Sequence, residues 1–147
     1  MTEIANSVLP LIRKTREMLR PFYGNVEAVE YKSERGHDAV TELDRKVETF
    51  LEAELHILYP DISFAGEEYG GDREVPRLWL CDPIDGTSHF IRGLPYCTVM
   101  LALIEEGQVN FGVIYDFVND IVYHAERGNG AFANNVPIRV SSRPTKD

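Results

Sequence analysis

The sequence predicts an α+β fold in which two helices pack on a mostly antiparallel meander sheet. Apolar residues recur every three to four positions in two segments before Pro60, which is typical of amphipathic helices. Beyond Pro60 the apolar residues instead form short runs, as expected for strands. Turn sequences rich in Gly, Asn and Asp separate these runs, so we expect each strand to pair with its neighbour in the chain.

The two predicted helices cover about residues 2–20 and 41–58. Pro10 lies inside the first pattern, so we expect a kink there or a helix that begins close to it. Pro60 closes the second helix, because proline cannot continue the hydrogen-bonding pattern. The polar stretch 32–38 between the helices predicts a mobile loop.

The predicted strands follow in rapid succession after the second helix. They cover about residues 62–65, 78–81, 96–104, 109–115, 121–125, 131–133 and 138–140. The run at 78–81 is apolar throughout, as in a buried strand. Because the later runs are joined by turns of a few residues, the sheet is expected to be a meander.

Composition and charge narrow the classes of function. The chain has 147 residues, with 15 Lys+Arg and 24 Asp+Glu, which gives a formal net charge of −9. That length fits one domain, and no apolar run reaches the roughly 18 residues of a membrane-spanning helix. The acidic balance disfavours nucleic acid as a partner. It is compatible with a phosphate substrate, because a bound cation reverses the local charge.

The cysteines and the N-terminus point to a cytoplasmic protein. Cys81 and Cys97 form no CxxC motif, so a zinc site is not expected. Both lie in apolar runs and are expected to be buried free thiols. The N-terminus carries no basic segment followed by an apolar one, as an export signal would.

The candidate chemistry lies where the buried strand at 78–81 ends. Pro83 is expected to stop strand pairing after Asp82, and Gly86 permits a tight turn after Asp85. Carboxylates held there suit Mg²⁺, which prefers oxygen ligands. The backbone from Gly86 to Ser88 is expected to open a short helix whose N–H groups face a phosphate.

A second acidic pair, Glu67 and Glu68, follows Gly66 at the end of the strand at 62–65. It can complete the same cation site. The residues alone leave an alternative open, because Asp-Pro and Asp-Gly pairs are common in turns and Glu-Glu pairs are usually solvated.

The stretch from Trp79 to Phe90 closely resembles the first signature of the inositol monophosphatase family, the Mg²⁺-dependent, Li⁺-sensitive sugar and inositol phosphatases. It contains Trp79-x-x-Asp82-Pro83-Ile84-Asp85-Gly86-Thr87-x-x-Phe90. Four other segments resemble further marks of the family in the expected order: Val40-Thr41-Glu42-Leu43-Asp44, Phe64-Ala65-Gly66-Glu67-Glu68, Phe111-Gly112-Val113-Ile114-Tyr115 and Arg127-Gly128-x-Gly130-Ala131. The resemblance implies the N-terminal part of the sugar phosphatase fold.

For the metal site, the resemblance implies a Mg²⁺-dependent phosphomonoesterase that acts on a small phosphate ester such as inositol monophosphate. Glu67, Asp82 and the carbonyl of Ile84 would hold a first metal ion. Asp82 and Asp85 would hold a second.

The resemblance also implies roles for the neighbouring residues. Asp44 would hydrogen-bond Thr87, and the pair would activate the attacking water. The Gly86 and Thr87 N–H groups would bind phosphate. Lys32 is a possible loop contact, and His89 would be a neighbour of the site and not a ligand.

Family members also have a C-terminal α/β domain, and its Trp-Asp signature does not occur in this chain. Residues 1–147 are therefore expected to be the N-terminal α+β metal-binding domain, weakly active or inactive by itself. An exposed apolar sheet face predicts homo-oligomerisation, with dimers the simplest case, or pairing with a missing C-terminal half. The alternative function is a non-catalytic metal-binding module with a regulatory or interaction role. Relatives act on inositol phosphates, adenosine bisphosphates, fructose bisphosphate and histidinol phosphate, so the substrate stays open.

Overall fold

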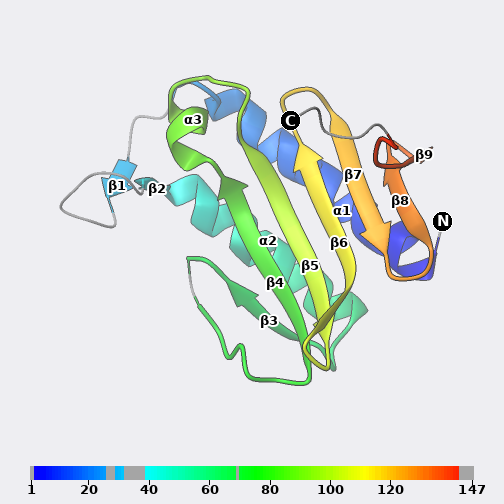
Figure 1. The fold of residues 1–147 in the computed structure, drawn as a ribbon. Coiled ribbons are helices and arrows are strands. Elements are labelled where there is room, and N and C mark those ends of the chain that lie inside the picture. The colour runs from blue at the N-terminus through cyan, green and yellow to red at the C-terminus, as the bar shows by residue number, and fades with distance from the viewer. Residues whose placement is uncertain (1, 26–28, 32–38, 69, 143–147) are drawn as a thin grey trace, which may run out of the picture.

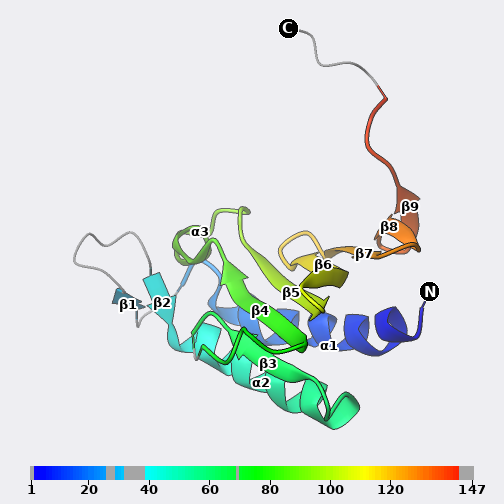
Figure 2. The same cartoon turned by 60° about the horizontal axis from the view of Figure 1, so that its bottom comes forward.

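Two long helices cover one face of a seven-stranded sheet, and none of the described helices lies over the opposite face (Figures 1 and 2). The computed structural model describes residues 2–25, 29–31, 39–68 and 70–142. The helical elements are α1 (Glu3–Leu19), the 3-10 turn η1 (Arg20–Phe22), α2 (Glu42–Leu58) and α3 (Thr87–Ile91). The strands are β1 (Val29–Tyr31), β2 (Ala39–Thr41), β3 (Ser63–Gly66), β4 (Arg77–Asp85), β5 (Thr98–Glu105), β6 (Gln108–Asp116), β7 (Ile121–Glu126), β8 (Gly130–Ala133) and β9 (Val136–Ile138).

The large sheet has its strands in chain order from β3 to β9. β3 is parallel to β4, and every later pair is antiparallel. The predicted α+β class and meander are therefore confirmed. The two-stranded ribbon of β1 and β2 was not predicted. The predicted loop at 32–38 lies outside the described residues.

Helix α1 begins after Thr2, whose hydroxyl accepts a hydrogen bond from the Ala5 N–H at 3.3 Å. The helix runs through Pro10 without ending, so the alternative that it begins close to Pro10 is wrong. None of the described helices is both long and apolar enough to cross a membrane.

The core lies between the two helices and the sheet. Its largest fully buried side chains include Trp79, Phe111 and Tyr115 from the strands and Leu51 and Leu55 from α2. Cys81 and Cys97 are free and buried, as expected.

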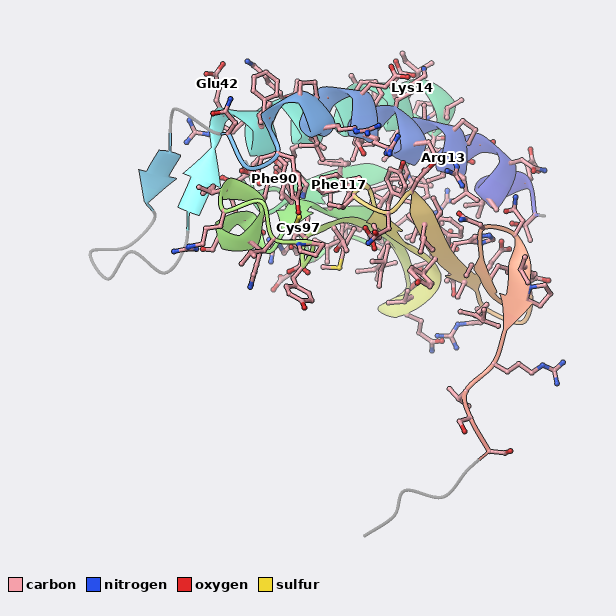
Figure 3. The ribbon with its side chains drawn as sticks, turned by 90° about the horizontal axis from the view of Figure 1, so that it is seen from above. Arg13, Lys14, Glu42, Phe90, Cys97 and Phe117 are labelled. Atoms are coloured by element: carbon pink, nitrogen blue, oxygen red, sulfur yellow. The ribbon has the colours of Figure 1, made fainter. Side chains whose placement is uncertain are left out.

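Phe90 anchors α3 to the main core. Its ring centroid lies 5.8 Å from that of Phe117, the neighbour labelled in Figure 3. The ring centroid of Tyr23 is 5.9 Å away. Gly24 adds a hydrogen bond from its N–H to the Phe90 carbonyl at 3.0 Å. Packing of Phe90, near the C-terminal end of α3, therefore also fixes the position of the helix start at Thr87.

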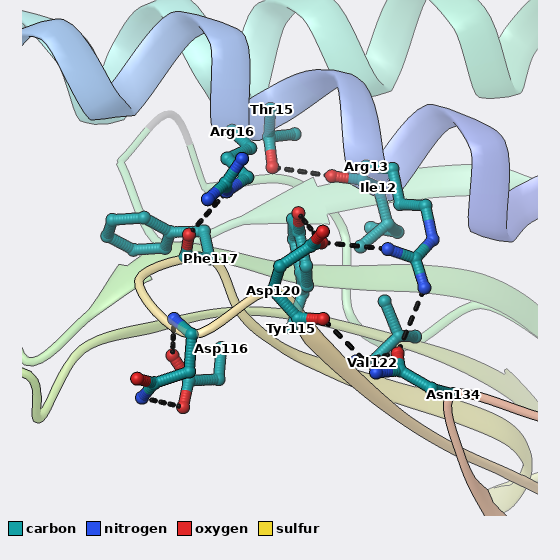
Figure 4. Close-up of polar contacts among 11 residues, drawn as sticks. Ile12, Arg13, Thr15, Arg16, Tyr115, Asp116, Phe117, Asp120, Val122 and Asn134 are labelled. Atoms are coloured by element: carbon teal, nitrogen blue, oxygen red, sulfur yellow. Dashed lines mark hydrogen bonds and ion pairs between the residues drawn. The ribbon is translucent and has the colours of Figure 1, made fainter. Parts of the chain in front are cut away.

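The end of the sheet near β7 and β8 is joined to α1 by the arginine cluster, which comprises Arg13, Tyr115, Asp120 and Asn134 (Figure 4). The Arg13 guanidinium donates to Asp120 at 2.8 Å and to the Asn134 side-chain oxygen at 3.0 Å. The Tyr115 hydroxyl also donates to Asp120, at 2.8 Å. Because donors surround the Asp120 carboxylate, its pKa is lowered, with the Tyr115 hydrogen bond as the largest cause.

Candidate active site

The segment predicted to carry the site residues, from Asp82 to Thr87, spans the end of β4 and the start of α3. Strand β4 extends to Asp85, further than predicted, because pairing resumes after Pro83. Asp82 pairs with Met100 and Asp85 with Thr98, with an irregularity between them. The prediction that pairing ends at Asp82 is therefore wrong: the bulge lets the strand pass a residue that cannot donate a backbone hydrogen bond.

Gly86 makes the turn between β4 and α3. It has φ +79°, in the left-handed region that favours glycine. A Cβ there would collide with the Tyr96 carbonyl oxygen, so close backbone packing also requires glycine. The predicted short helix is confirmed as α3, and the His89 N–H bonds to the Gly86 carbonyl at 2.8 Å.

The Ile84 carbonyl and the Thr87 hydroxyl meet at the same turn. Thr87 donates to the Ile84 oxygen at 2.9 Å. A hydroxyl has one proton to donate, so Thr87 donates to Asp44, as the resemblance implies, only by leaving Ile84. The predicted Asp44–Thr87 contact stays a prediction.

Four carboxylates from three elements form the acidic cluster: Asp44, Glu67, Asp82 and Asp85. β3 and β4 run parallel, with Gly66 paired to Cys81, so Glu67, which follows β3, lies at the level of Asp82 within β4. The structure thus brings together the two acidic pairs that lie far apart in the sequence.

The pKa of Asp82 reflects its burial and the negative charges around it. Its pKa is raised to about 7, first by burial and then by the charges of Glu67 and Asp85. A hydrogen bond that protonated Asp82 donates to Glu67, and the charge of Asp44, add to the shift. Asp82 Oδ1 is buried and has no hydrogen-bond partner among the described residues. An unpartnered buried carboxylate oxygen among other acids is the environment that a cation would stabilise.

The other members of the acidic cluster differ in burial. Asp44 is 1% exposed, whereas the Glu67 and Asp85 side chains are exposed. Within the described parts of the chain, no group of three or more His, Cys, Asp or Glu side chains is arranged so that it could hold a metal ion. The donors fit Mg²⁺ by type, because carboxylate oxygens are the ligands that this ion prefers.

An apolar cavity of about 580 Å³ extends from the acidic cluster across the uncovered face of the sheet. Glu67 and Asp82 line one end, and Met100, Ile114 and Tyr123 continue the lining from neighbouring strands. Ile114 is 45% and Tyr123 40% exposed. The site therefore opens onto an apolar surface and not into the helix-covered core.

The sequence analysis missed Glu48, which lies one turn after Asp44 on α2 and is 1% exposed. One of its oxygens accepts the Glu68 N–H at 2.8 Å. The available signal was an acid on the buried stripe of the helix, next to Val47 and Leu51. Lys32, the possible loop contact, lies outside the described residues.

Comparison with known proteins decides the family. The sequence profile described as "Inositol monophosphatase family" matches residues 1–147. The chain belongs to the inositol monophosphatase family. Its similarity to a Thermotoga maritima protein named "Fructose-1,6-bisphosphatase/inositol-1-monophosphatase" is 39% identity over 133 residues, which cover 90% of this chain and 51% of the relative. A Chlorobaculum parvum "Histidinol-phosphatase" is 37% identical over 146 residues, covering 97% of this chain and 55% of the relative.

Solved structures of this family agree with the fold. The Thermotoga maritima IMPase superposes with a TM-score of 0.89 at 37% identity, covering 96% of this chain and 55% of that one. The extragenic suppressor protein suhB from Bartonella henselae gives a TM-score of 0.88 at 34% identity, covering 97% and 56%. The chain thus spans about half the length of the relatives it matches, and these relatives confirm the predicted fold and family.

Proposed function

We propose that this inositol monophosphatase family chain carries the metal- and phosphate-binding half of a Mg²⁺-dependent phosphomonoesterase. Family membership supports a phosphatase-type function. The observation that carries the finer proposal is Asp82, whose buried unpartnered oxygen lies among Glu67, Asp85 and Asp44. Mutual repulsion in that cluster favours a bound cation over a metal-free state.

The proposed metal ligands are Glu67, Asp82, Asp85 and the Ile84 carbonyl. A bound Mg²⁺ would lower the pKa of water and offset the charge of the phosphoryl group. The charges of both Glu67 and Asp85 act on Asp82, which makes Asp82 the natural shared ligand of two ions. The exposed Glu67 and Asp85 would complete the two sites.

The residues around the turn would handle the phosphate and the water. The Gly86 and Thr87 N–H groups at the start of α3 would donate to phosphoryl oxygens, as backbone N–H groups at the start of a helix do. Asp44, the most buried member of the acidic cluster, would accept a hydrogen bond from Thr87. The Thr87 oxygen would orient the attacking water and accept its proton while the Thr87 hydroxyl passes its own proton to Asp44, which lowers the cost of deprotonating the water.

The uncovered sheet face supports a partner, and we propose that it docks the C-terminal half of the family fold. The chain covers only 51% of the Thermotoga maritima relative, and the apolar cavity reaches from Asp82 to Tyr123. Sedimentation is expected to show a one-to-one complex with a separately expressed C-terminal half. Self-association alone would assign the face to a second copy, whereas a sharply monomeric profile of the mixture at high concentration would contradict docking.

The second candidate function is a non-catalytic metal-binding module with a regulatory or interaction role. The observation that favours it is the coverage of about half of the relatives. The phosphatase-type site residues are intact, which favours the enzymatic proposal. The substrate would be a small phosphorylated molecule, and the names of the relatives suggest inositol monophosphate, fructose 1,6-bisphosphate and histidinol phosphate as test compounds.

Mixing the chain with the C-terminal half of the Thermotoga maritima relative tests the enzymatic proposal. We expect Mg²⁺-dependent phosphate release from at least one of the three compounds. Asp85→Asn should abolish it, and Asp61→Asn, the same change in an exposed turn, should not. Docking and Mg²⁺ binding without phosphate release would instead favour the non-catalytic module.

A further inference from the structure

Helix α2 places two buried carboxylates one turn apart, Asp44 and Glu48, each 1% exposed. Burying a charge is costly unless hydrogen bonds or other charges compensate it. The proposed function gives Asp44 a part in handling water. It gives no part to Glu48, although that side chain lies equally deep.

The Glu48 carboxylate contacts both neighbours of the proposed metal ligand Glu67. Its Oε2 accepts the N–H of Glu68 at 2.8 Å, a charge-assisted hydrogen bond. On the other side, a Cβ on Gly66 would collide with the Glu48 carboxyl group. Glycine at 66 therefore makes room for this carboxylate, and the turn 66–68 closes around it.

The same carboxylate lies next to Gly66, which pairs with the strand that carries Asp82. Gly66 pairs with Cys81, the residue before Asp82. Burial raises the pKa of the Cys81 thiol, and the Glu48 charge is the next largest cause. The Glu48 side chain thus lies at the level of the Gly66–Cys81 pair, one residue before both Glu67 and Asp82.

We propose that Glu48 is a positioning residue that sets the placement of Glu67 relative to Asp82 and Asp44. This inference rests on the proposed function, because it assigns Glu67 to the metal. Glu48 is not itself a ligand, since it lies buried beneath the turn and one of its oxygens holds the Glu68 amide. Asp44 and Glu48 lie on the same helix. The hydrogen bond between Glu48 and the Glu68 N–H therefore also fixes the position of Asp44 relative to the proposed metal ligands.

Four substitutions in the full chain test this, with Mg²⁺ affinity measured by calorimetry and Glu68 amide exchange measured by NMR. Glu48→Ala removes the acceptor, and Glu48→Asp keeps the charge but shortens the side chain by one methylene. Both should weaken Mg²⁺ binding by roughly ten- to a hundredfold, as loss of a group that orients a ligand does, and both should speed exchange at Glu68. Glu48→Gln keeps an acceptor oxygen and should restore most of the affinity and protection. Glu52→Ala, an exposed acid one turn further along α2, is the matched control and should change neither.

The outcomes separate this inference from the function on which it rests. Wild-type affinity in folded Glu48→Ala and Glu48→Asp would overturn the positioning role alone. Equal losses in the Gln and Ala variants would also overturn it, because they would point to charge and not to placement. Should Glu48→Ala fail to fold by circular dichroism, the Asp and Gln pair decides. If the wild-type chain does not bind Mg²⁺, or binds it in a way that Asp85→Asn does not weaken, the proposed metal site is wrong, and the positioning role of Glu48 falls with it.

Discussion

The acidic cluster and the arginine cluster each contain an aspartate, but its pKa is shifted in opposite directions in the two. In the arginine cluster, Asp120 is surrounded by donors from Tyr115 and Arg13, and its pKa is lowered. In the acidic cluster, Asp82 faces other acids, its pKa is raised to about 7, and one oxygen has no partner among the described residues. A structural carboxylate such as Asp120 is paired with a cation of the protein itself. A carboxylate that binds a ligand, as proposed for Asp82, has no such cation, and its negative charge is left for the ligand to neutralise.

Metal binding should separate the two clusters most strongly. Asp82→Asn removes the carboxylate that the other acids surround, and we expect Mg²⁺ affinity to fall by at least about a hundredfold. Asp120→Asn is the same substitution in the arginine cluster and should leave the affinity unchanged. Calorimetry on both variants measures this, and an equal loss in both would show that the clusters differ in stability and not in function.

Two glycine turns, one at Gly86 and one between β7 and β8, offer a second contrast. Gly86 and Gly128 both have positive φ, +79° and +81°, but only Gly86 has neighbours where a Cβ would be. Gly128→Ala should cost about 1 kcal/mol for the left-handed backbone. Gly86→Ala should cost about 3 kcal/mol or more, because a collision with the Tyr96 carbonyl is added. Urea unfolding measures both, and equal costs would mean that the backbone at Tyr96 yields easily.

Stability without metal should change in opposite directions in the two clusters. Asp82→Asn relieves repulsion and should stabilise the metal-free chain by about 1 kcal/mol, as removal of functional strain often does. Asp120→Asn weakens the bonds from Arg13 and Tyr115 and should destabilise it by about 1 kcal/mol, a modest value because the pair is partly exposed. Chemical unfolding in a metal chelator checks the signs, and two changes of the same sign would refute the contrast.

Local patterns in the sequence predicted most of the fold. The apolar periods of α2 and the short runs of the meander are set within each element, so the sequence shows them directly. Strands β1 and β2 have three residues each, too few for a period to emerge. The extension of β4 through Pro83 depends on a bulge against β5, which no single segment encodes.

The sequence motif predicted the residues of the candidate site, but not the buried Glu48 that contacts the turn carrying Glu67. Asp82, Asp85 and Glu67 stand out as acids at strand ends, and the pairing of Gly66 with Cys81 brings them to one level. Glu48 escaped notice because an acid in an amphipathic helix is normally solvated, and only the tertiary contact with the turn after Gly66 explains its burial. Long-range contacts of this kind are what a reading of local patterns lacks.

The smallest expected effect concerns His124, at the same end of the sheet as the arginine cluster. Its ring stacks on Phe132 at 5.1 Å and is 6% exposed, and burial lowers its pKa below the usual 6.5. A lowered pKa means that the unfolded chain binds the proton more readily than the folded one. The contribution of His124 is therefore full above about pH 6.5 and is lost as the pH falls through the folded-state value. His124→Gln should flatten the decline in unfolding free energy between neutral and mildly acidic pH, measured in urea without metal. The lowered pKa of Asp120 means that its contribution to stability is lost only at lower pH, so it does not affect the slope in this range. An unchanged slope in His124→Gln would show that groups other than His124 cause the acid sensitivity.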